Sequence, residues 1–485
     1  MDDLLKRDAT DQLVALASRQ VSAVELLKGA FARHEQTHGA LNAVIAVDLE
    51  RALAQAQAID GQRVQGEALG PLAGLPMTIK DTLDVAGLPA SSGLPHLRQR
   101  TCEDASAVAR ARRAGAVVWG KTNIPVMAAD WQSFNNLYGT TNNPWNLSLT
   151  PGGSSGGAAA ALTVGVTALE IGSDIGGSLR IPASFCGIYS HKPTWGLVSQ
   201  RGHVPPQPGS WSERDLNVIG PMARSARDLR LLLSVIEGGA LAAKAPPARL
   251  KAGSLKAARI ALWIDEPSFP LDPQVRTAIE TFAAALSAAG AEVTPIASPV
   301  HMPTLMGAYQ VLLGGTVGED MPDGTIRMMQ WMRGFARWQL ARGAAPTSTA
   351  AMTMAYTATH REWLAADAVR ARLRHEIGAV FDRFDAILSP ITPVTAFPHD
   401  HQPFIRRQLT LSNGPAIAYP AMLNWISLAT ALHLPATAIP AGLAASGLPV
   451  GVQLIGPLND DASTLALAQA IEDEVGGFVA PEMAR

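Results

Sequence analysis

The 485-residue chain has few cysteines, and their number excludes two classes of protein. Only Cys102 and Cys186 are present, and two cysteines so far apart give neither a disulfide framework nor a ligand set for zinc. The eleven histidines are interpreted as scattered, without a metal-binding His-x-x-x-His or His-Glu-x-x-His spacing, so the sequence is not expected to encode a metal-dependent hydrolase. We therefore expect no metal, no organic cofactor and a reducing, cytoplasmic location.

An excess of charge of one sign is also lacking, as are long apolar runs. The formal net charge is −2, so neither nucleic acid nor an anionic membrane is an expected partner. Residues 1–7 lack the apolar core of a secretory signal, and no apolar stretch reaches the length of a membrane span. We expect a small-molecule substrate, whereas the sequence leaves the oligomeric state open.

Apolar residues make up 47% of the chain and charged residues 16%, which is enough hydrocarbon for a large core. Short apolar runs bounded by Gly, Pro or Asp alternate with helix-period segments, as in α/β proteins. Strands are predicted at 75–80, 116–119, 167–171, 259–264, 292–296, 386–388, 436–439 and 451–455. Helices are predicted from Ser22 with a capping box to Glu25, and at 105–114, 158–162, 226–236, 273–289, 361–381 and 462–474. The prediction is one α/β domain over residues 1–485.

A variable helical insert is predicted at about residues 300–375, because residues 302–354 hold eight of the fourteen methionines. Two interpretations are open. Ordinary helical core filled by adaptable side chains is the favoured one. A flexible apolar lid over a substrate site is the alternative, and it predicts a bulky acyl or aryl substrate.

The segment from Thr150 to Ser199 carries the chemistry. Gly176 and Gly177 directly precede Ser178, and consecutive glycines let backbone N–H groups converge on one point. If Ser178 attacks a carbonyl, four N–H groups are available for the developing oxyanion, each contributing about 3 kcal/mol; they belong to Ile175, Gly176, Gly177 and Ser178. The alternative for Gly-Gly-Ser taken alone is a tight turn with a capping serine.

The serine needs a base, and the sequence offers an unusual one. A Gly-x-Ser-x-Gly elbow is absent, because Arg180 stands where its second glycine would be, and no histidine is obviously available. A buried lysine serves as a base when its pKa falls toward neutrality, and a second serine can relay the proton. Lys80, at the end of an apolar run, is the candidate.

These residues lie in four long motifs: PLAGLPMTIKDTLDVAGLPASSG, GTTNNPWNLSLTPGGSSGGAAAAL, GSDIGGSLRIPASFCG and HKPTWGLVS. Their content and order resemble the amidase signature family. The resemblance implies one compact α/β domain with a mixed central sheet flanked by helices. It also implies Ser178 as nucleophile, Ser154 as a bridging serine with a cis peptide bond, and Lys80 as base. Ser155, Asp174 and Arg180 would support the loops.

One departure from the family pattern is Ser190, where glycine is common. The neighbouring His191 and Lys192 are interpreted as structural residues in a packed turn.

Three functions are compatible with these features to different degrees. The first is a free-standing hydrolase of aliphatic or aryl amides, with aryl carbamates included. The second is an amidotransferase subunit that hydrolyses glutamine and passes ammonia to a partner chain. The third is a catalytically silent binding module, which the presence of Lys80, Ser154 and Ser178 argues against.

Overall fold

The computed structural model describes residues 1–485 except 206, 241, 243–253, 257, 345–347 and 485. Its centre is an eleven-stranded sheet with the order β1-β3-β2-β6-β8-β7-β14-β15-β11-β9-β10. The sheet strands are β1 (Val44–Val47), β2 (Pro76–Lys80), β3 (Val117–Thr122), β6 (Leu169–Asp174), β7 (Tyr189–Lys192), β8 (Val218–Ala223), β9 (Arg259–Leu262), β10 (Glu292–Pro295), β11 (Ala386–Pro390), β14 (Ala436–Leu443) and β15 (Pro449–Ile455). The sheet is mixed, as predicted, because β2 runs parallel to β3 and β6 while β8 runs antiparallel to β6.

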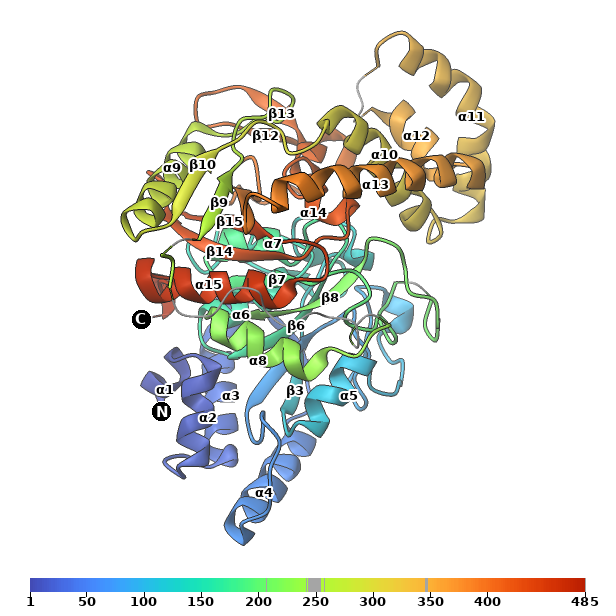
Figure 1. Cartoon of the computed structure of the whole chain (residues 1–485). Coiled ribbons are helices and arrows are strands. Elements are labelled where there is room, and N and C mark those ends of the chain that lie inside the picture. Colours follow the sequence, from blue (N-terminus) through green and yellow to red (C-terminus); the bar gives the residue numbers. More distant parts are fainter. Residues whose placement is uncertain (206, 241, 243–253, 257, 345–347, 485) are drawn as a thin grey trace.

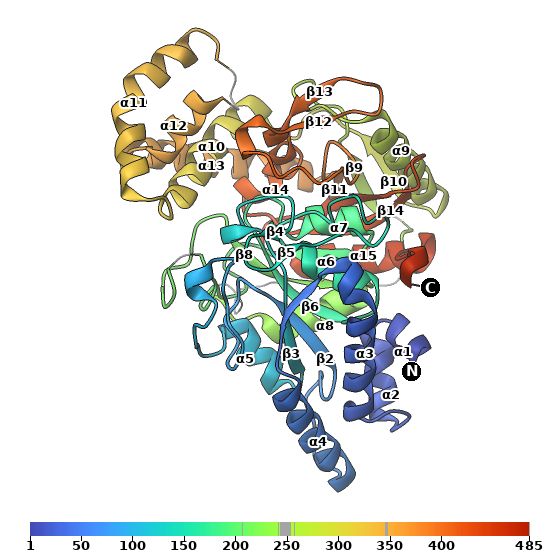
Figure 2. The ribbon, with the colours of Figure 1, turned by 180° about the vertical axis from the view of Figure 1, so that it is seen from behind.

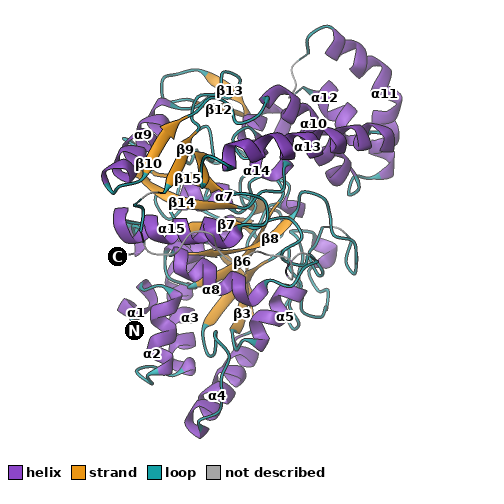
Figure 3. Cartoon of the chain, viewed as in Figure 1, coloured by secondary structure: helices purple, strands orange, loops and turns teal. Residues whose placement is uncertain are grey.

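Helices cover both faces of this sheet (Figures 1 and 3). In Figure 1, α8 and α15 lie in front of the strands, and Figure 2 shows α6 and α7 on the opposite side. The helices are α1 (Asp2–Lys6), α2 (Ala9–Ala17), α3 (Ala23–Leu41), α4 (Leu49–Gln65), α5 (Ser106–Arg113), α6 (Gly156–Thr163), α7 (Arg180–Cys186), α8 (Ala226–Ile236), α9 (Pro273–Ala288), α10 (Met302–Gly318), α11 (Asp323–Ala341), α12 (Thr349–Tyr356), α13 (His360–Phe381), α14 (Ser427–Ala431) and α15 (Asp461–Val475). Two further strand pairs join β4 (Phe134–Asn135) to β5 (Gly139–Thr140) and β12 (Gln408–Thr410) to β13 (Ala416–Ala418).

Local sequence signals set several of these boundaries. The capping box is present, with Glu25 N–H donating to the Ser22 hydroxyl and the Ser22 N–H donating to the Glu25 carboxylate. Helix α8 has the predicted ends and begins where the Ser225 side chain accepts from the Asp228 N–H. The other predicted helices and strands are present, with ends that differ by a few residues.

The predicted packed turn at His191 and Lys192 is wrong, because both residues belong to β7, between β8 and β14 in the sheet. The strand was not predicted because these polar side chains do not fit the apolar pattern expected of a buried strand. The His191 ring bridges the Thr437 hydroxyl at 2.8 Å and the Asp461 carboxylate at 3.0 Å, and Lys192 Nζ donates to the Pro193 carbonyl. Hydrogen-bond partners that are distant in sequence thus satisfy these polar groups, which is why they can be buried in a strand.

The methionine-rich segment forms α10, α11 and α12, and the predicted insert also includes much of α13; these helices project to the upper right in Figure 1, on the side away from α9 and β10. Ordinary core does not describe α11, whose only fully buried side chain is Ala336. Its outer face exposes Met328, Trp331, Phe335 and Trp338, with Trp331 87% exposed. By contrast, α10 and α12 turn methionines toward a cavity in the molecule.

Candidate active site

The sheet brings together residues that the motifs keep apart in sequence. Lys80 is the last residue of β2 and Asp174 the last of β6. Because these two strands are parallel neighbours, their carboxyl ends lie at the same edge of the sheet. Ser178 follows β6 in the turn before α7, and Ser154 lies in the loop before α6. The Lys80 side chain is fully buried, and both serines are buried.

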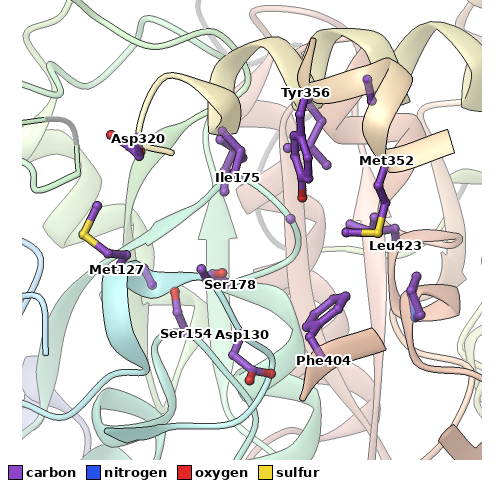
Figure 4. A pocket seen from close by; sticks show the side chains of 18 of the residues that line it. Met127, Asp130, Ser154, Ile175, Ser178, Asp320, Met352, Tyr356, Phe404 and Leu423 are labelled. Carbon is purple, nitrogen blue, oxygen red and sulfur yellow. The ribbon is translucent and has the colours of Figure 1, made fainter. Parts of the chain in front are cut away.

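Lys80 and the two serines form a connected cluster. Lys80 Nζ lies 2.7 Å from Ser154 Oγ, within hydrogen-bonding distance. The Ser154 and Ser178 side chains lie beside each other at the wall of one cavity (Figure 4). The Gly153–Ser154 peptide bond is cis, as the resemblance implies. The structure therefore places the three predicted catalytic candidates within one site.

The surroundings of Lys80 lower its pKa from 10.5 to about 7. Burial is the main cause, since it disfavours the charged ammonium, while Asp174 and Glu170 oppose the shift. Burial also raises the pKa of Glu170 to about 8. A lysine with a pKa near 7 has an appreciable neutral fraction at physiological pH and can accept a proton.

The turn that carries Ser178 is tied down on both sides. The Asp174 carboxylate accepts hydrogen bonds from the Gly177 N–H at 2.8 Å and from the Leu179 N–H at 3.1 Å. The indole N–H of Trp131 donates to the Gly176 carbonyl at 2.8 Å. The Gly177 N–H is thus already engaged within the turn, which weakens its candidacy as an oxyanion donor relative to the N–H groups of Ile175, Gly176 and Ser178.

The predicted supporting residues surround this turn. Arg180 donates two hydrogen bonds to Asp174 at 3.0 Å each, from Nε and Nη2, while Nη1 donates to Gln453 and Nη2 also donates to Thr430. Burial raises the pKa of Asp174, but Arg180 outweighs it and keeps this pKa below its ordinary value. The Ser155 N–H donates to the Ser178 carbonyl at 3.3 Å. Ser190 lies farther off in β7, with a buried hydroxyl that has no hydrogen-bond partner among the described residues.

Ser154 and Ser178 open into a cavity of about 510 Å³. Its lining beyond the two serines is largely apolar, and Figure 4 shows part of it; the apolar side chains include Met127, Ile175, Met306, Leu313, Val317, Met321, Met352, Tyr356, Phe404 and Leu423. These come from the turn after β6, from α10 and the turn that follows it, from α12, and from loops and short 3-10 turns after β3, β11 and β13.

Three charged side chains line the cavity, Asp130, Arg214 and Asp320, and all of them are paired with protein groups. Asp130 lies 2.5 Å from Arg407 and accepts a 2.7 Å hydrogen bond from the Tyr419 hydroxyl. Arg214 donates to Asp320 at 2.7 Å and to Glu319 at 3.0 Å. Each of these charges therefore has a partner of opposite sign within the protein, which leaves the space between them suited to an uncharged ligand.

Two residues of this site, Ser173 and His203, were not predicted from the sequence. Ser173 Oγ lies 2.9 Å from Lys80 Nζ on one side and 2.9 Å from His203 Nε2 on the other. Ser173 was within reach of sequence reasoning, since it directly precedes Asp174 at the end of the same strand. His203 carried no such signal, because it arrives from a loop about thirty positions later.

The sequence also contains a His-Glu-x-x-His spacing from His34 to His38, which corrects the expectation that the histidines are only scattered. The two rings lie 4.9 Å apart on α3, and His34 packs edge-on against Trp119. Across the described part of the chain, no group of three or more His, Cys, Asp or Glu side chains is placed to hold a metal ion. Among the same described residues, no helix has the length and hydropathy of a membrane span.

Comparison with known proteins identifies the family. The family model described as Amidase matches residues 25–465. The A subunit of the glutamyl-tRNA(Gln) amidotransferase of Synechococcus sp. (strain CC9605) is 34% identical, over 97% of this chain and 96% of the relative. Two solved structures have the same fold. A bacterial aryl acylamidase of the amidase signature family has a TM-score of 0.79 and 25% identity, over 97% and 96% of the two chains. The peptide amidase of Stenotrophomonas maltophilia has a TM-score of 0.76 and 26% identity, over 98% of each. The chain therefore belongs to the amidase signature family, whose members are enzymes that hydrolyse the C–N bonds of amides.

Proposed function

We propose that this enzyme hydrolyses carboxamides that carry a bulky apolar group, aryl amides and aryl carbamates included, through an acyl-enzyme on Ser178. The observation that carries the proposal is the position of Ser178 between a lysine with a lowered pKa and an apolar cavity. The first supports attack on a carbonyl, and the second supports a substrate without charge.

In the proposed mechanism, neutral Lys80 accepts the Ser154 hydroxyl proton while Ser154 accepts the proton of Ser178. Ser178 Oγ attacks the carbonyl carbon, and the N–H groups of Ile175, Gly176 and Ser178 stabilise the oxyanion. The proton on Lys80 returns through Ser154 to the nitrogen of the leaving amine, and the C–N bond breaks. Water then attacks the acyl-enzyme by the same proton path, which restores Ser178 and releases the acid.

Asp174 and Arg180 have a supporting role in this mechanism. The Asp174 carboxylate holds the turn through the Gly177 and Leu179 N–H groups, and Arg180 joins that turn to α14 and β15. A turn held at several points keeps the oxyanion donors in place before the substrate arrives, which is the condition for electrostatic catalysis. Lys80 and the backbone supply the base and the charge stabilisation, so the mechanism requires neither a metal nor an organic cofactor.

A second candidate is the glutamine-hydrolysing component of an amidotransferase complex. The names of the curated relatives favour it, since the A subunits of glutamyl-tRNA(Gln) amidotransferases are about one third identical over nearly the whole chain. The cavity favours the first candidate. Glutamine carries an ammonium and a carboxylate that need charged partners, whereas Asp130 and Arg214 already bind Arg407 and Asp320.

The test is release of amine or ammonia by the purified chain from anilides, aryl carbamates, aliphatic amides and glutamine. We expect turnover of anilides or carbamates without a second protein. Ser178→Ala should lower it by about 10⁴-fold or more, and Ser234→Ala, at an exposed position on α8, should leave it unchanged. Activity on glutamine alone, or only with a partner chain, would establish the second candidate. Full activity of Ser178→Ala would refute both.

A further inference from the structure

His203 occupies a fixed position beside Ser173, and both residues belong to the lining of the cavity. Its backbone forms an isolated bridge to Leu83, and the next residue, Val204, donates its N–H to the Thr82 carbonyl at 2.7 Å. The segment that carries His203 is thus attached to the chain directly after β2, the strand that ends in Lys80. The ring is buried, with 7% of the residue exposed, and it reaches Lys80 only through the Ser173 hydroxyl.

His203 and Ser173 form an arm of hydrogen bonds that ends at Lys80, and the direction of each bond in this arm follows from chemistry. The Pro205 carbonyl can only accept, so His203 Nδ1, at 2.6 Å, must carry a hydrogen. In a neutral ring the other nitrogen, Nε2, is then an acceptor, and it accepts the hydroxyl hydrogen of Ser173 at 2.9 Å. Because the hydroxyl hydrogen of Ser173 points to His203, Ser173 Oγ accepts a hydrogen bond from Lys80 Nζ.

This order determines where the lone pair of a neutral lysine points. Neutral Lys80 has two N–H bonds and one lone pair. Ser173 accepts a hydrogen bond from each of these N–H groups, through its hydroxyl oxygen at 2.9 Å and its carbonyl oxygen at 3.3 Å. The third neighbour is Ser154 Oγ at 2.7 Å. The lone pair is left facing the Ser154 hydroxyl, which is the direction that proton transfer from Ser154 requires.

We propose that His203 is a positioning residue, which acts through Ser173 to aim the lone pair of Lys80 at Ser154. This role rests on the proposed function of Lys80 as the base. No proton enters or leaves the His203 arm during the reaction. The proton from Ser154 forms the third N–H bond of Lys80 and later returns to Ser154, while the hydrogens of His203 and Ser173 stay on their own atoms.

Without His203, the Ser173 hydroxyl would be free to turn and donate to the Lys80 lone pair. That contact would stabilise neutral Lys80 and at the same time block it as a base. Loss of His203 should therefore have a distinctive signature. The reactivity of Ser178 falls, although the midpoint of its pH dependence, which reports the pKa of Lys80, moves to lower pH. The other groups that bear on this arm are Asp174 and Glu170 beside Lys80, and Lys121 and Arg214 beside His203.

The experiment measures how fast a fluorophosphonate probe labels Ser178 in the full chain between pH 5 and 9, because labelling needs no knowledge of the substrate. Peptide mass spectrometry locates the label. We expect His203→Leu to lower the plateau rate by about 10-fold to 100-fold and to shift the midpoint down by about half a pH unit or more. His203→Gln, whose side-chain carbonyl can accept from Ser173, should recover part of the rate. His375→Leu, at an exposed position on α13, should label at the wild-type rate.

Ser173 provides a second, independent pair of variants in case His203→Leu does not fold. Ser173→Ala removes the middle of the arm and should give slow labelling, whereas Ser173→Thr keeps the hydroxyl and should retain most of the rate. The losses of labelling rate in His203→Leu and Ser173→Ala should not add in the double variant, because both substitutions break the same hydrogen-bonded arm. A folded His203→Leu protein with the wild-type plateau and midpoint would overturn the role of His203. Failure of the wild-type chain to label at Ser178 would instead refute the proposed function.

Discussion

The two walls of the cavity around Ser178 differ in almost every physical respect. The wall formed by the sheet edge is polar and buried, and the side chains of Lys80, Asp174 and Arg180 all form hydrogen bonds with other protein groups. The wall formed by α10 and α12 is apolar, with Met306, Met352 and similar side chains facing the cavity. The polar wall is built from the amidase motifs, whereas the apolar wall comes from the segment outside them.

The difference suggests a division of labour. A polar network with fixed bond directions sets proton positions and charge stabilisation, so small changes in it should affect any substrate. An apolar surface sets volume and shape, so changes in it should separate substrates by size. Variants in the two walls should therefore differ in kind as well as in magnitude.

After the loss of Ser178 itself, the largest effect is expected in the polar wall, at the base. Lys80→Met should lower kcat/KM by about 10³-fold or more, because it removes the proton acceptor. In the wild type, kcat/KM should rise with pH through about 7 and level off above it, since the lysine must lose its proton to act. Lys192→Met is the matched control, because Lys192 is also buried with a pKa of about 7 but bonds the Pro193 carbonyl. An inflection near pH 7 that survives Lys80→Met would contradict this assignment.

The next effect concerns the ion pair beneath the Ser178 turn. Asp174→Asn should lower the free energy of unfolding by about 3 kcal/mol or more, because it leaves the buried Arg180 charge without its partner. Chemical denaturation measures this loss. Asp265→Asn removes the partner of Arg276 at the surface and should change the free energy of unfolding by less than about 1 kcal/mol. Similar losses in the two variants would show that the buried pair has no special role.

A change in the apolar wall should discriminate between substrates. Met352→Trp adds volume to the cavity and should lower kcat/KM for a bulky anilide by about 10-fold to 100-fold, while a small aliphatic amide is turned over as before. The ratio of the two kcat/KM values is the measurement. Met328→Trp on the exposed face of α11 should leave that ratio unchanged. An equal loss for both substrates would place Met352 in the catalytic machinery and remove the contrast between the walls.

The smallest effect is expected on the outer face of α11. Trp331→Gln should change the free energy of unfolding by no more than about 0.5 kcal/mol, because the side chain is 87% exposed and loses few contacts. Trp263→Ala, at a fully buried position, should cost about 3 to 5 kcal/mol in the same denaturation measurement. A large loss at Trp331 would mean that this face is covered in solution.

Much of the fold was predictable because its signals are local. The capping box at Ser22 and the apolar period of α8 are set by residues three or four positions apart, and both are present. Strand β7 was not predicted because it carries polar side chains, and the residues that satisfy His191, namely Thr437 and Asp461, lie far along the chain. Strand β8 escaped because Gly220 and Pro221 interrupt its apolar pattern; no Cβ would fit at Gly220, since the His191 carbonyl oxygen would lie 2.2 Å from it.

The family, the α/β class and the candidates Lys80, Ser154 and Ser178 could be read from the amino-acid sequence, because they depend on motifs with fixed spacing. How these groups behave depends on the folded chain. The lowered pKa of Lys80 requires burial by several elements, and the order of hydrogen bonds at Ser173 requires a histidine from a distant loop. The neutral cavity likewise depends on Asp130 meeting Arg407 across 277 positions. Burial and pairing of this kind are properties of the tertiary arrangement, and no local pattern in the sequence encodes them.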